Sequence, residues 1–244
     1  MIMDIESHLH PRVTLLEKIG PSVHPVFGVD ANGKPTSRGT GFLVGEERYL
    51  VTNYHVLEDA ARSFLGIVSD DTYLIDQVIA FDKEKDIFIC LPRDLPKDLP
   101  YLSLSSQIPA TGSPIAVIGY LPTGSIGLEP IHSPGIVSSI HKNLRGYYVH
   151  GRLQTFGKTI QMTAPCPPGS SGNPVVTMSG AVIGVVTSTL ESDQNVSFAV
   201  PGCVVQDMIA SADQPLGFSS IAAANRSEGG YDPVASWRSK WPGY

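Results

Sequence analysis

Charged residues are scarce in this sequence. Asp, Glu, Lys and Arg make up 16% of its 244 residues, and the formal net charge is -6. A surface that binds nucleic acid needs clustered Lys and Arg side chains to neutralise the phosphates. We therefore expect a protein without a nucleic-acid partner.

Cysteine is also rare, and the N-terminus lacks the pattern of a secretory signal. Cys90, Cys166 and Cys203 form an odd, small set that does not suit a disulfide framework and fits a reducing compartment. The opening residues, MIMDIESHLHPRV, carry two acids before the first Arg and no basic segment followed by an apolar one. These features favour a cytoplasmic location.

Long hydrophobic runs are missing as well. The longer apolar stretches, such as residues 115–118 and 181–186, fall far short of the ~20 residues that span a bilayer. No membrane segment is expected. Hydrophobic residues still make up 42% of the chain, which allows a sizeable core and argues against general disorder.

The sequence does contain many short runs rich in Val, Ile, Phe and Tyr, with turn residues between them. Its 24 Gly and 20 Pro residues are spread along the chain rather than gathered in one linker. Many short strands separated by turn signals predict an all-β sandwich or a pair of barrels. Helical signals are limited to residues 11–20, 56–62 and 201–211.

Three separate segments carry residues that suit nucleophilic catalysis. Residues 165–176 read PCPPGSSGNPVV and place Ser171 in a Gly- and Pro-rich loop before an apolar run. His55 lies between a strand-like run and a helical signal, and Asp86 abuts the apolar run IFICL, which favours it over the nearby Asp82. Each signal is weak alone. The order His, Asp, Ser across two β-rich halves is typical of chymotrypsin-type enzymes.

Several blocks occur in an order that strengthens this interpretation. They are LLEKIGPSV, GTGFLVGEERYLVTNYHVLEDA, KDIFICLP, GSPIAVIGY, PGIVSSI, PPGSSGNPVV and AVIGVVTSTLESDQNVSFAVP. Together they resemble the trypsin-like serine peptidases, and most closely the HtrA (DegP-like) branch without its appended PDZ domain. The resemblance implies two six-stranded antiparallel β-barrels, short helices near both ends, and a serine endopeptidase that acts on protein or peptide substrates.

The resemblance, with the prolines of residues 92–112, also suggests how the chain is divided. We expect a leader at residues 1–21 and a first barrel, with His55 and Asp86, at 22–100. A second barrel with Ser171 and a C-terminal helix would occupy 101–211, and a tail would follow at 212–244.

The resemblance implies a role for each site residue. His55 would be the general base, Asp86 would orient its imidazole, and Ser171 would be the nucleophile. The backbone N–H groups of Gly169 and Ser171 would form an oxyanion hole. No metal ion and no cofactor is expected.

The pocket for the residue before the cleaved bond would be lined by Pro165, Thr187, Ser188, Thr189 and Asn195. The three segments that would form this pocket, residues 164–168, 187–189 and 195–197, contain no Asp or Glu. A buried Lys or Arg side chain needs a carboxylate partner. We therefore expect cleavage after small or medium uncharged residues.

Two residues of the serine loop depart from the usual pattern of the family. Ser170 stands where an acid or amide is usual, so it cannot pair with a new N-terminal amine, and we expect no activation by N-terminal processing. Asn173 stands where the family has Gly, and it either tightens or distorts the turn after Ser171. The change at Asn173 therefore leaves a second interpretation open, a catalytically inactive domain that binds proteins. The sequence also leaves open whether the chain forms an oligomer. An esterase with a Gly-x-Ser-x-Gly elbow is disfavoured, because the loop reads Gly-Ser-Ser-Gly in an all-β context.

Overall fold

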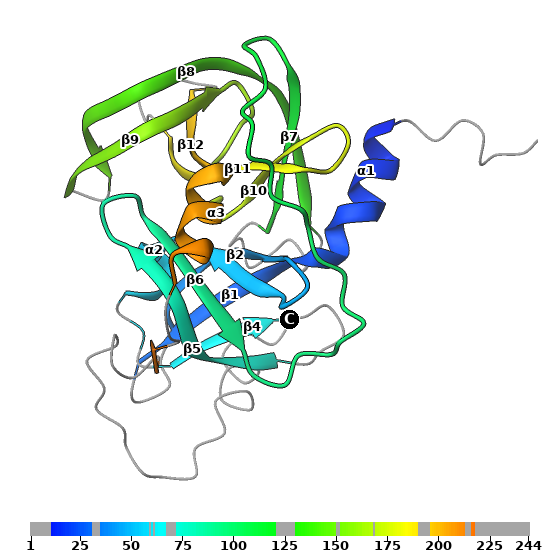
Figure 1. Ribbon diagram of the computed structural model, residues 1–244, viewed down its shortest axis with the longest axis vertical. Helices are drawn as coiled ribbons and strands as arrows, with labels where there is room; N and C mark the ends of the chain where they lie inside the picture. Colours follow the sequence, from blue (N-terminus) through cyan, green and yellow to red (C-terminus); the bar gives the residue numbers. More distant parts are fainter. Residues whose placement is uncertain are drawn as a thin grey trace, which may run out of the picture.

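The computed structural model of the chain describes residues 11–30, 35–58, 60, 62–66, 72–120, 130–149, 152–167, 169–189, 196–212 and 216–217. Within these residues strands dominate and the helices are short (Figure 1). The helical elements are α1 (Pro11–Ile19), the 3₁₀ turn η2 (Gly20–Ser22), α2 (Tyr54–Leu57) and α3 (Gly202–Ala210). The strands are β1 (Val23–Val29), β2 (Pro35–Val44), β3 (Tyr49–Thr52), β4 (Arg62–Gly66), β5 (Thr72–Asp82), β6 (Ile87–Pro92), β7 (Pro114–Gly119), β8 (Ile131–Val149), β9 (Arg152–Met162), β10 (Pro174–Thr177), β11 (Val182–Thr189), β12 (Ser197–Pro201) and β13 (Leu216–Gly217).

The first sheet is built from the N-terminal half of the chain and curls on itself. Its strand order is β13-β5-β4-β1-β2-β3-β6, and β5 also pairs with β6, so strands β1 to β6 pair in a ring. All of these pairs are antiparallel. The sheet therefore has one strand more than expected, because Leu216 and Gly217 of β13 pair with Val78 and Gln77 of β5. This part of the predicted tail belongs to the first sheet, and residues 218–244 lie outside the described part of the chain.

The second sheet closes into a six-stranded barrel in the order β10-β11-β12-β9-β8-β7. Its pairs are antiparallel too, and β8 and β9 extend as a long hairpin of 19 and 11 residues (Figure 1). The all-β, trypsin-like fold expected from the sequence is confirmed. Helices α1 and α3 occupy the expected segments 11–20 and 201–211. The third expected helix, at 56–62, forms only as the single turn α2, which begins before His55.

Strands that lie between the two sheets are buried on both faces. In β3, Leu50 belongs to the cluster inside the first sheet, whereas Val51 belongs to a cluster that also contains Val185 and Val200 of the second barrel. Successive strand residues point to opposite faces, so both faces of such a strand must be apolar. This explains why β6 reads as the continuous run IFICL rather than as an alternating one. The shared cluster packs the two sheets together.

Helix α1 contacts the second barrel, although the chain then enters the first sheet. Leu15 and Ile19 belong to the shared cluster, and Lys18 Nζ donates a hydrogen bond to the carbonyl of Ser179 at 3.1 Å. The turn between β10 and β11 accommodates the helix at Gly180, where a Cβ atom would lie 3.3 Å from Ile19 Cγ2. The N-terminal segment therefore packs on both halves. The boundaries expected at residues 21, 100 and 211 stay predictions.

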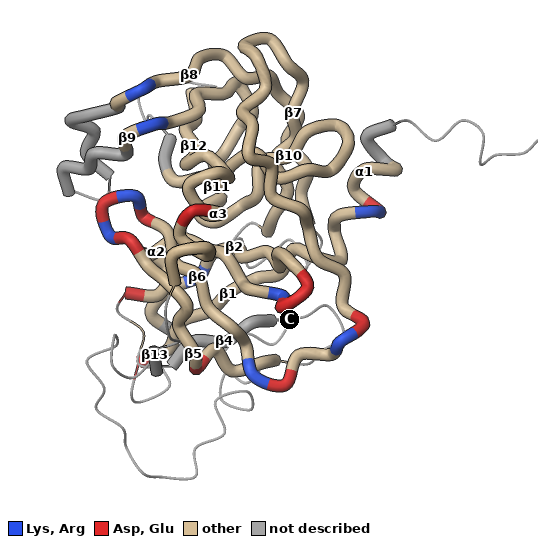
Figure 2. The backbone as a smooth tube through the Cα atoms, in the orientation of Figure 1, with Lys and Arg blue, Asp and Glu red and all other residues tan. Residues whose placement is uncertain are grey.

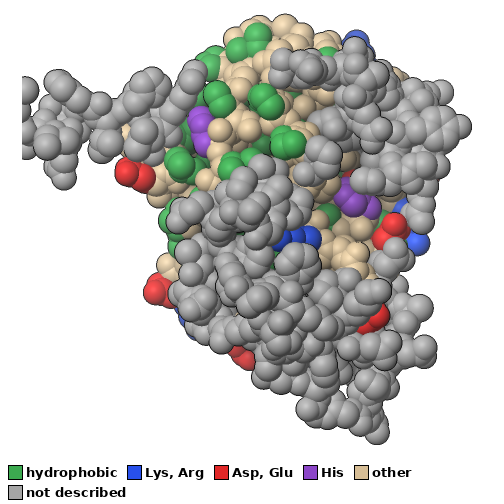
Figure 3. All heavy atoms as spheres, turned by 180° about the vertical axis from the view of Figure 1, so that it is seen from behind, with side chains coloured by type: hydrophobic (Ala, Val, Ile, Leu, Met, Phe, Trp, Pro, Cys, Tyr) green, Lys and Arg blue, Asp and Glu red, His purple; other side chains and the backbone are tan. Residues whose placement is uncertain are grey.

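Polar and apolar side chains are unevenly distributed over the surface. Among the described residues, charged side chains lie mainly at the turns of the first sheet, and few lie on the second barrel (Figure 2). Apolar side chains reach the surface over the second barrel, as the view from behind shows (Figure 3). In β8, Ile136 and Ile140 are 41% and 37% exposed. Of the helices among the described residues, none has the length and apolar character needed to cross a membrane.

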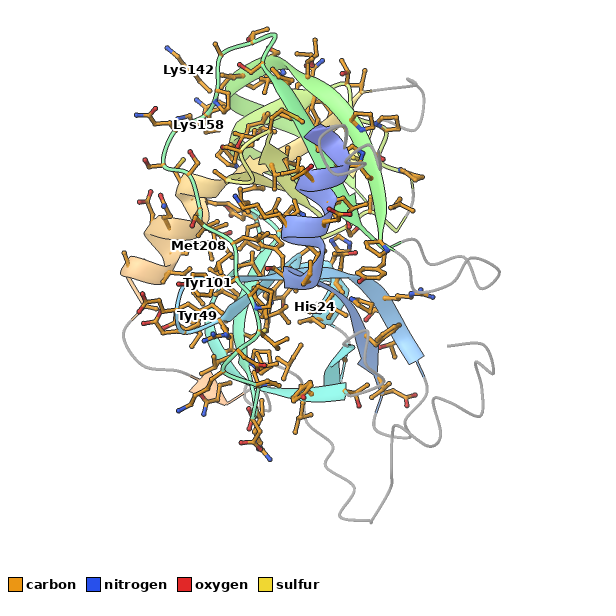
Figure 4. All side chains as sticks on the ribbon, turned by 90° about the vertical axis from the view of Figure 1, so that its right-hand side faces the viewer. His24, Tyr49, Tyr101, Lys142, Lys158 and Met208 are labelled. Carbon is orange, nitrogen blue, oxygen red and sulfur yellow. The ribbon has the colours of Figure 1, made fainter. Side chains whose placement is uncertain are left out.

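His24 is a buried histidine at the start of β1, near the end of α1 (Figure 4). It is only 2% exposed. Within the described residues, neither of its ring nitrogens has a hydrogen-bond partner. Burial lowers the pKa of His24 from 6.5 to about 4, because the imidazolium would be desolvated without a counter-charge. The ring is therefore neutral in the folded protein at neutral pH.

This burial predicts an acid-dependent loss of stability. Well above pH 6.5 the ring is neutral in both the folded and the unfolded chain. As pH falls from 6.5 to about 4, the unfolded chain takes up a proton that the folded chain does not, so the free energy of unfolding decreases. One pKa unit corresponds to about 1.4 kcal/mol, so His24 should account for a loss of about 3 kcal/mol across this range.

Urea titrations at pH 7 and pH 4 measure this loss. On acidification from pH 7 to pH 4, the unfolding free energy of wild type should fall by about 3 kcal/mol more than that of His24→Phe. His141→Gln serves as the control, because His141 is only partly buried and its Nε2 lies 2.8 Å from Gln161 Oε1. An equal acid response in wild type and His24→Phe would show that His24 does not contribute.

Candidate active site

The chain enters the site at the end of β3 and places His55 in the single turn of α2. Asn53 precedes this turn with an extended backbone (φ -81°, ψ 150°), so the chain turns sharply after the buried strand. The backbone N–H of His55 donates to Asp86 Oδ1 at 3.0 Å. The His55 side chain is 20% exposed, so one edge of the imidazole reaches the surface.

Asp86 lies between β5 and β6, at the last position before the buried run of β6. Its backbone adopts the left-handed region (φ 57°), which Asp tolerates better than most residues. The Asn53 side-chain amide donates to the Asp86 carbonyl at 2.8 Å and thereby supports this conformation. The residue is 1% exposed.

The Asp86 carboxylate is hydrogen-bonded from three directions. Oδ1 accepts the His55 backbone N–H, and Oδ2 lies 2.8 Å from His55 Nδ1. The Thr187 hydroxyl, from β11 of the second barrel, donates to the same Oδ2 at 2.9 Å. A buried carboxylate is costly unless it is paired and hydrogen-bonded. These three donors satisfy it, and they fix the imidazole so that Nδ1 faces Asp86.

Asp82, the other carboxylate considered from the sequence, interacts elsewhere. Its Oδ1 accepts the backbone N–H of Lys85 at 2.9 Å, and its Oδ2 forms an ion pair with Lys85 Nζ. Burial raises the pKa of Asp82, but the hydrogen bonds and charge of Lys85 outweigh this effect and lower it below its usual value. Asp86, and not Asp82, is the carboxylate in contact with His55.

Ser171 reaches the imidazole from the loop between β9 and β10. Its Oγ lies 2.9 Å from His55 Nε2. Its carbonyl accepts the backbone N–H of Thr40 in β2 at 3.0 Å, so the first sheet holds the loop in place. The next residue must be Gly, because Gly172 has a φ of 82° and a Cβ there would lie 2.0 Å from the Thr40 carbonyl oxygen.

The residues before Ser171 form a tight turn. Ser170 N–H donates to the Pro167 carbonyl at 3.0 Å, and Gly169 has a φ of 97°. A positive φ at the third residue of a four-residue turn is typical of a type II turn. Within the described residues, the N–H groups of Gly169 and Ser171 donate to no other group. Both are therefore available to an oxygen bound beside Ser171.

The predicted pocket residues are placed as follows. Pro165 is exposed, whereas Ala164, Cys166 and Ser197 beside it are buried. Thr187 is 2% exposed, and its hydroxyl is directed at Asp86. Ser188 and Thr189 continue β11 and pair with Phe198 and Ser197 of β12. Asn195 lies outside the described residues.

Cys166 and Ser197 both contact the Ala164 carbonyl oxygen. Ser197 Oγ donates to the Ala164 carbonyl at 2.9 Å, and Cys166 Sγ lies 3.5 Å from the same oxygen. Burial raises the pKa of the Cys166 thiol to about 11, although a hydrogen bond with Ser197 opposes the shift. The thiol is therefore neutral and unreactive near pH 7. In the described part of the chain, no group of three or more His, Cys, Asp and Glu side chains is placed to hold a metal ion.

Three contacts at the site could not be anticipated from the sequence. They are the bonds from Asn53 to the Asp86 carbonyl, from Thr187 to the Asp86 carboxylate and from Thr40 to the Ser171 carbonyl. The sequence gives only a weak indication of these contacts, which is that the three donor residues are polar and lie next to, or within, apolar strands. Such residues are buried only when their polar atoms find partners.

Comparisons with known proteins agree with this geometry. Residues 39–185, which include His55, Asp86 and Ser171, match the family described as Trypsin-like peptidase domain. The chain is 30% identical over 233 residues to the mitochondrial serine protease HTRA2 of Bos taurus, which covers 92% of this chain and 46% of that protein. It is 29% identical over 193 residues to a probable periplasmic serine endoprotease DegP-like of Chlamydia muridarum, which covers 75% of this chain and 36% of that protein.

Solved structures support the same fold. The active form of the Rv3671c protease from M. tuberculosis superimposes with a TM-score of 0.70 at 23% identity, covering 84% of this chain and 87% of that one. The HtrA-type protease AlgW with a tripeptide gives a TM-score of 0.66 at 26% identity, covering 81% of this chain and 63% of that one. The chain spans between about a third and a half of the length of the two curated relatives. On the family match over residues 39–185, the chain belongs to the trypsin-like peptidase domain family.

Proposed function

We propose that this chain is a serine endopeptidase in which His55, Asp86 and Ser171 carry the chemistry. The observation that supports this most strongly is the position of one imidazole between two partners. His55 Nδ1 lies 2.8 Å from Asp86 Oδ2, and Nε2 lies 2.9 Å from Ser171 Oγ. A serine hydroxyl is a weak nucleophile unless a base within hydrogen-bond reach accepts its proton.

In the first half of the reaction, Ser171 Oγ would attack the carbonyl carbon of the scissile peptide bond. A C–O bond forms while the hydroxyl proton moves to His55 Nε2. The Asp86 carboxylate stabilises the imidazolium through Nδ1–H. When the C–N bond breaks, His55 returns this proton to the leaving amine, and an ester remains on Ser171.

In the second half, water would replace the amine. His55 accepts a proton from water as its oxygen attacks the ester carbonyl. The C–O bond to Ser171 then breaks, and His55 donates the proton to Ser171 Oγ. The enzyme returns to its starting protonation state, and an acid is released as the second product.

The negative charge on the substrate oxygen would be held by the N–H groups of Gly169 and Ser171. These two groups have no other acceptor within the described residues. The turn closed by the Ser170 N–H and the Pro167 carbonyl would fix them before substrate arrives, so little reorganisation is needed. Each donor of this kind typically contributes about 10²- to 10³-fold to turnover.

The residue before the cleaved bond should be small or medium-sized and uncharged. The buried residues in the predicted pocket region include Ala164, Cys166, Thr187 and Ser197, and neither the thiol nor the two hydroxyls carry a charge near pH 7. A Lys or Arg side chain there would be desolvated without a carboxylate. We expect cuts after Val, Ala, Ile, Leu or Thr.

A digest of a proteome-derived peptide library tests both the activity and this specificity. New peptide termini should form with wild type and be absent with Ser171→Ala run in parallel. Cuts mainly after Lys or Arg would contradict the pocket assignment while leaving the activity intact. No new termini with wild type would favour the alternative of an inactive domain that binds proteins. The expected partners are protein or peptide substrates, and both the cytoplasmic location and any oligomer stay predictions.

A further inference from the structure

Asn173 is a buried polar residue immediately after the nucleophile turn. Its backbone N–H donates to the Ser170 carbonyl at 3.1 Å, and its carbonyl accepts the Val186 N–H at 2.9 Å. The residue therefore connects the Ser171 loop to β11. The side chain is enclosed as well, since the whole residue is only 1% exposed.

The Asn173 side chain is not held there by hydrogen bonding through its oxygen. Within the described residues, Oδ1 is buried and has no hydrogen-bond partner. Leaving an amide oxygen in this state is costly. Because Oδ1 forms no hydrogen bond, the burial of Asn173 needs a different structural reason, and the packing of its side chain provides one.

The side chain lies directly over Gly119, the last residue of β7. A Cβ atom on Gly119 would lie 1.9 Å from Asn173 Oδ1, 2.2 Å from Cγ and 2.6 Å from Nδ2. Gly119 does not have a positive φ, so its backbone conformation does not demand glycine. A side chain at residue 119 would therefore overlap the Asn173 amide.

The end of β7 is also linked to Ser171 through Thr40. The backbone N–H of Tyr120 donates to Thr40 Oγ1 at 3.0 Å, and the Thr40 N–H donates to the Ser171 carbonyl at 3.0 Å. Thr40 is fixed in turn, because the Thr52 hydroxyl donates to its carbonyl at 2.7 Å. Ser171 thus lies between Thr40 and Asn173. Thr40 contacts Tyr120, and Asn173 packs against Gly119.

We propose that Asn173 and Gly119 form a complementary pair that positions the Ser171 loop for catalysis. Asn173 is a positioning residue, since it acts through the backbone of the loop and not on the substrate. The inference rests on the proposed peptidase activity. It predicts that a substitution at either residue alone displaces or loosens the Ser171 loop. The two substitutions together should restore the position of the loop.

Kinetics of three variants test the pair. Gly119→Ala should lower kcat by about 100-fold with KM changed less than threefold, because a misplacement of about 1 Å at the reacting atoms has an effect of this size. Asn173→Gly should lower kcat about tenfold, because the loop loses its support without a clash. Gly119→Ala/Asn173→Gly should recover at least tenfold over Gly119→Ala, because the new methyl group occupies the vacated space.

Two further readouts separate positioning from folding. The rate at which a fluorophosphonate labels Ser171, expressed per folded molecule, should follow the kcat series. Thermal unfolding should show that Gly119→Ala is destabilised and that Asn173→Gly offsets this loss. Gly20→Ala is the matched control, because the atom nearest to a Cβ at Gly20 is 4.0 Å away, and it should behave as wild type.

The outcomes distinguish this inference from the proposed function. If wild type cleaves peptides but the Gly119→Ala and Asn173→Gly effects simply add in the double variant, the pair is refuted and the peptidase remains. If the variants lose stability in this pattern but keep wild-type kcat and labelling rates, the pair only packs, and the positioning role is wrong. If wild type itself neither cleaves nor labels, the proposed function fails and the positioning role fails with it.

Discussion

Ser171→Ala is expected to lower kcat for peptide hydrolysis by about 10⁵- to 10⁶-fold, as removal of a serine nucleophile does in other triad enzymes. The change removes the Ser171 Oγ atom, which lies 2.9 Å from His55 Nε2. What remains is slow hydrolysis by water, assisted by the N–H groups of Gly169 and Ser171. The effect is measured by single-turnover kinetics on a peptide that the library digest identifies.

The fold should survive this change, because Ser171 is partly exposed and its backbone contacts stay in place. The Thr40 N–H donates to the Ser171 carbonyl, which alanine also has. Circular dichroism and thermal unfolding should therefore match wild type. A folded Ser171→Ala protein that cleaves as fast as wild type would overturn the assignment of the nucleophile.

Asp86→Asn is expected to lower kcat by about 10⁴-fold with the site geometry almost unchanged. The two carboxylate oxygens face different groups. Oδ1 accepts a backbone N–H, which is always a donor, so the NH₂ of asparagine cannot sit there. It must take the place of Oδ2 and donate to His55 Nδ1. The imidazole is then protonated on Nε2, faces Ser171 as a donor, and cannot accept its proton.

The control for this prediction is Asp82→Asn. Asp82 pairs with Lys85 and does not contact His55 in the described structure, so its loss should change kcat by less than about threefold. Parallel kinetics on the same peptide compare the two variants. A similar loss in both, or a full rate in Asp86→Asn, would contradict the role given to Asp86.

The sequence predicted the strands, both terminal helices and the three residues that meet at the site. It could do so because each lies in a local pattern: an apolar run, a turn of Gly and Pro, or a polar residue at the end of a strand. Chain order then joined the three signals. The choice of Asp86 over Asp82 rested on its position next to a buried strand, and this is where the contact with His55 is found.

Contacts across the two sheets could not be predicted in this way. Thr187 was expected at the substrate pocket, and that place stays a prediction. The contact that could not be predicted is the hydrogen bond from its hydroxyl to Asp86, which is 101 positions away in the chain. No local pattern encodes such a pairing. The same holds for β13, which pairs with β5 far upstream, and for the side chain of Asn173 over Gly119. The turn α2 was placed too late because its start depends on the backbone of Asn53 rather than on helix propensity.

Labelling with a fluorophosphonate, followed by mass spectrometry of the digested protein, tests the central claim most directly. The reagent forms a covalent bond with a serine only when a base removes the hydroxyl proton. We predict one phosphonate on Ser171 in wild type, and none in Ser171→Ala or His55→Ala. A folded wild-type protein that stays unlabelled, or that carries the label on another serine, would contradict the account.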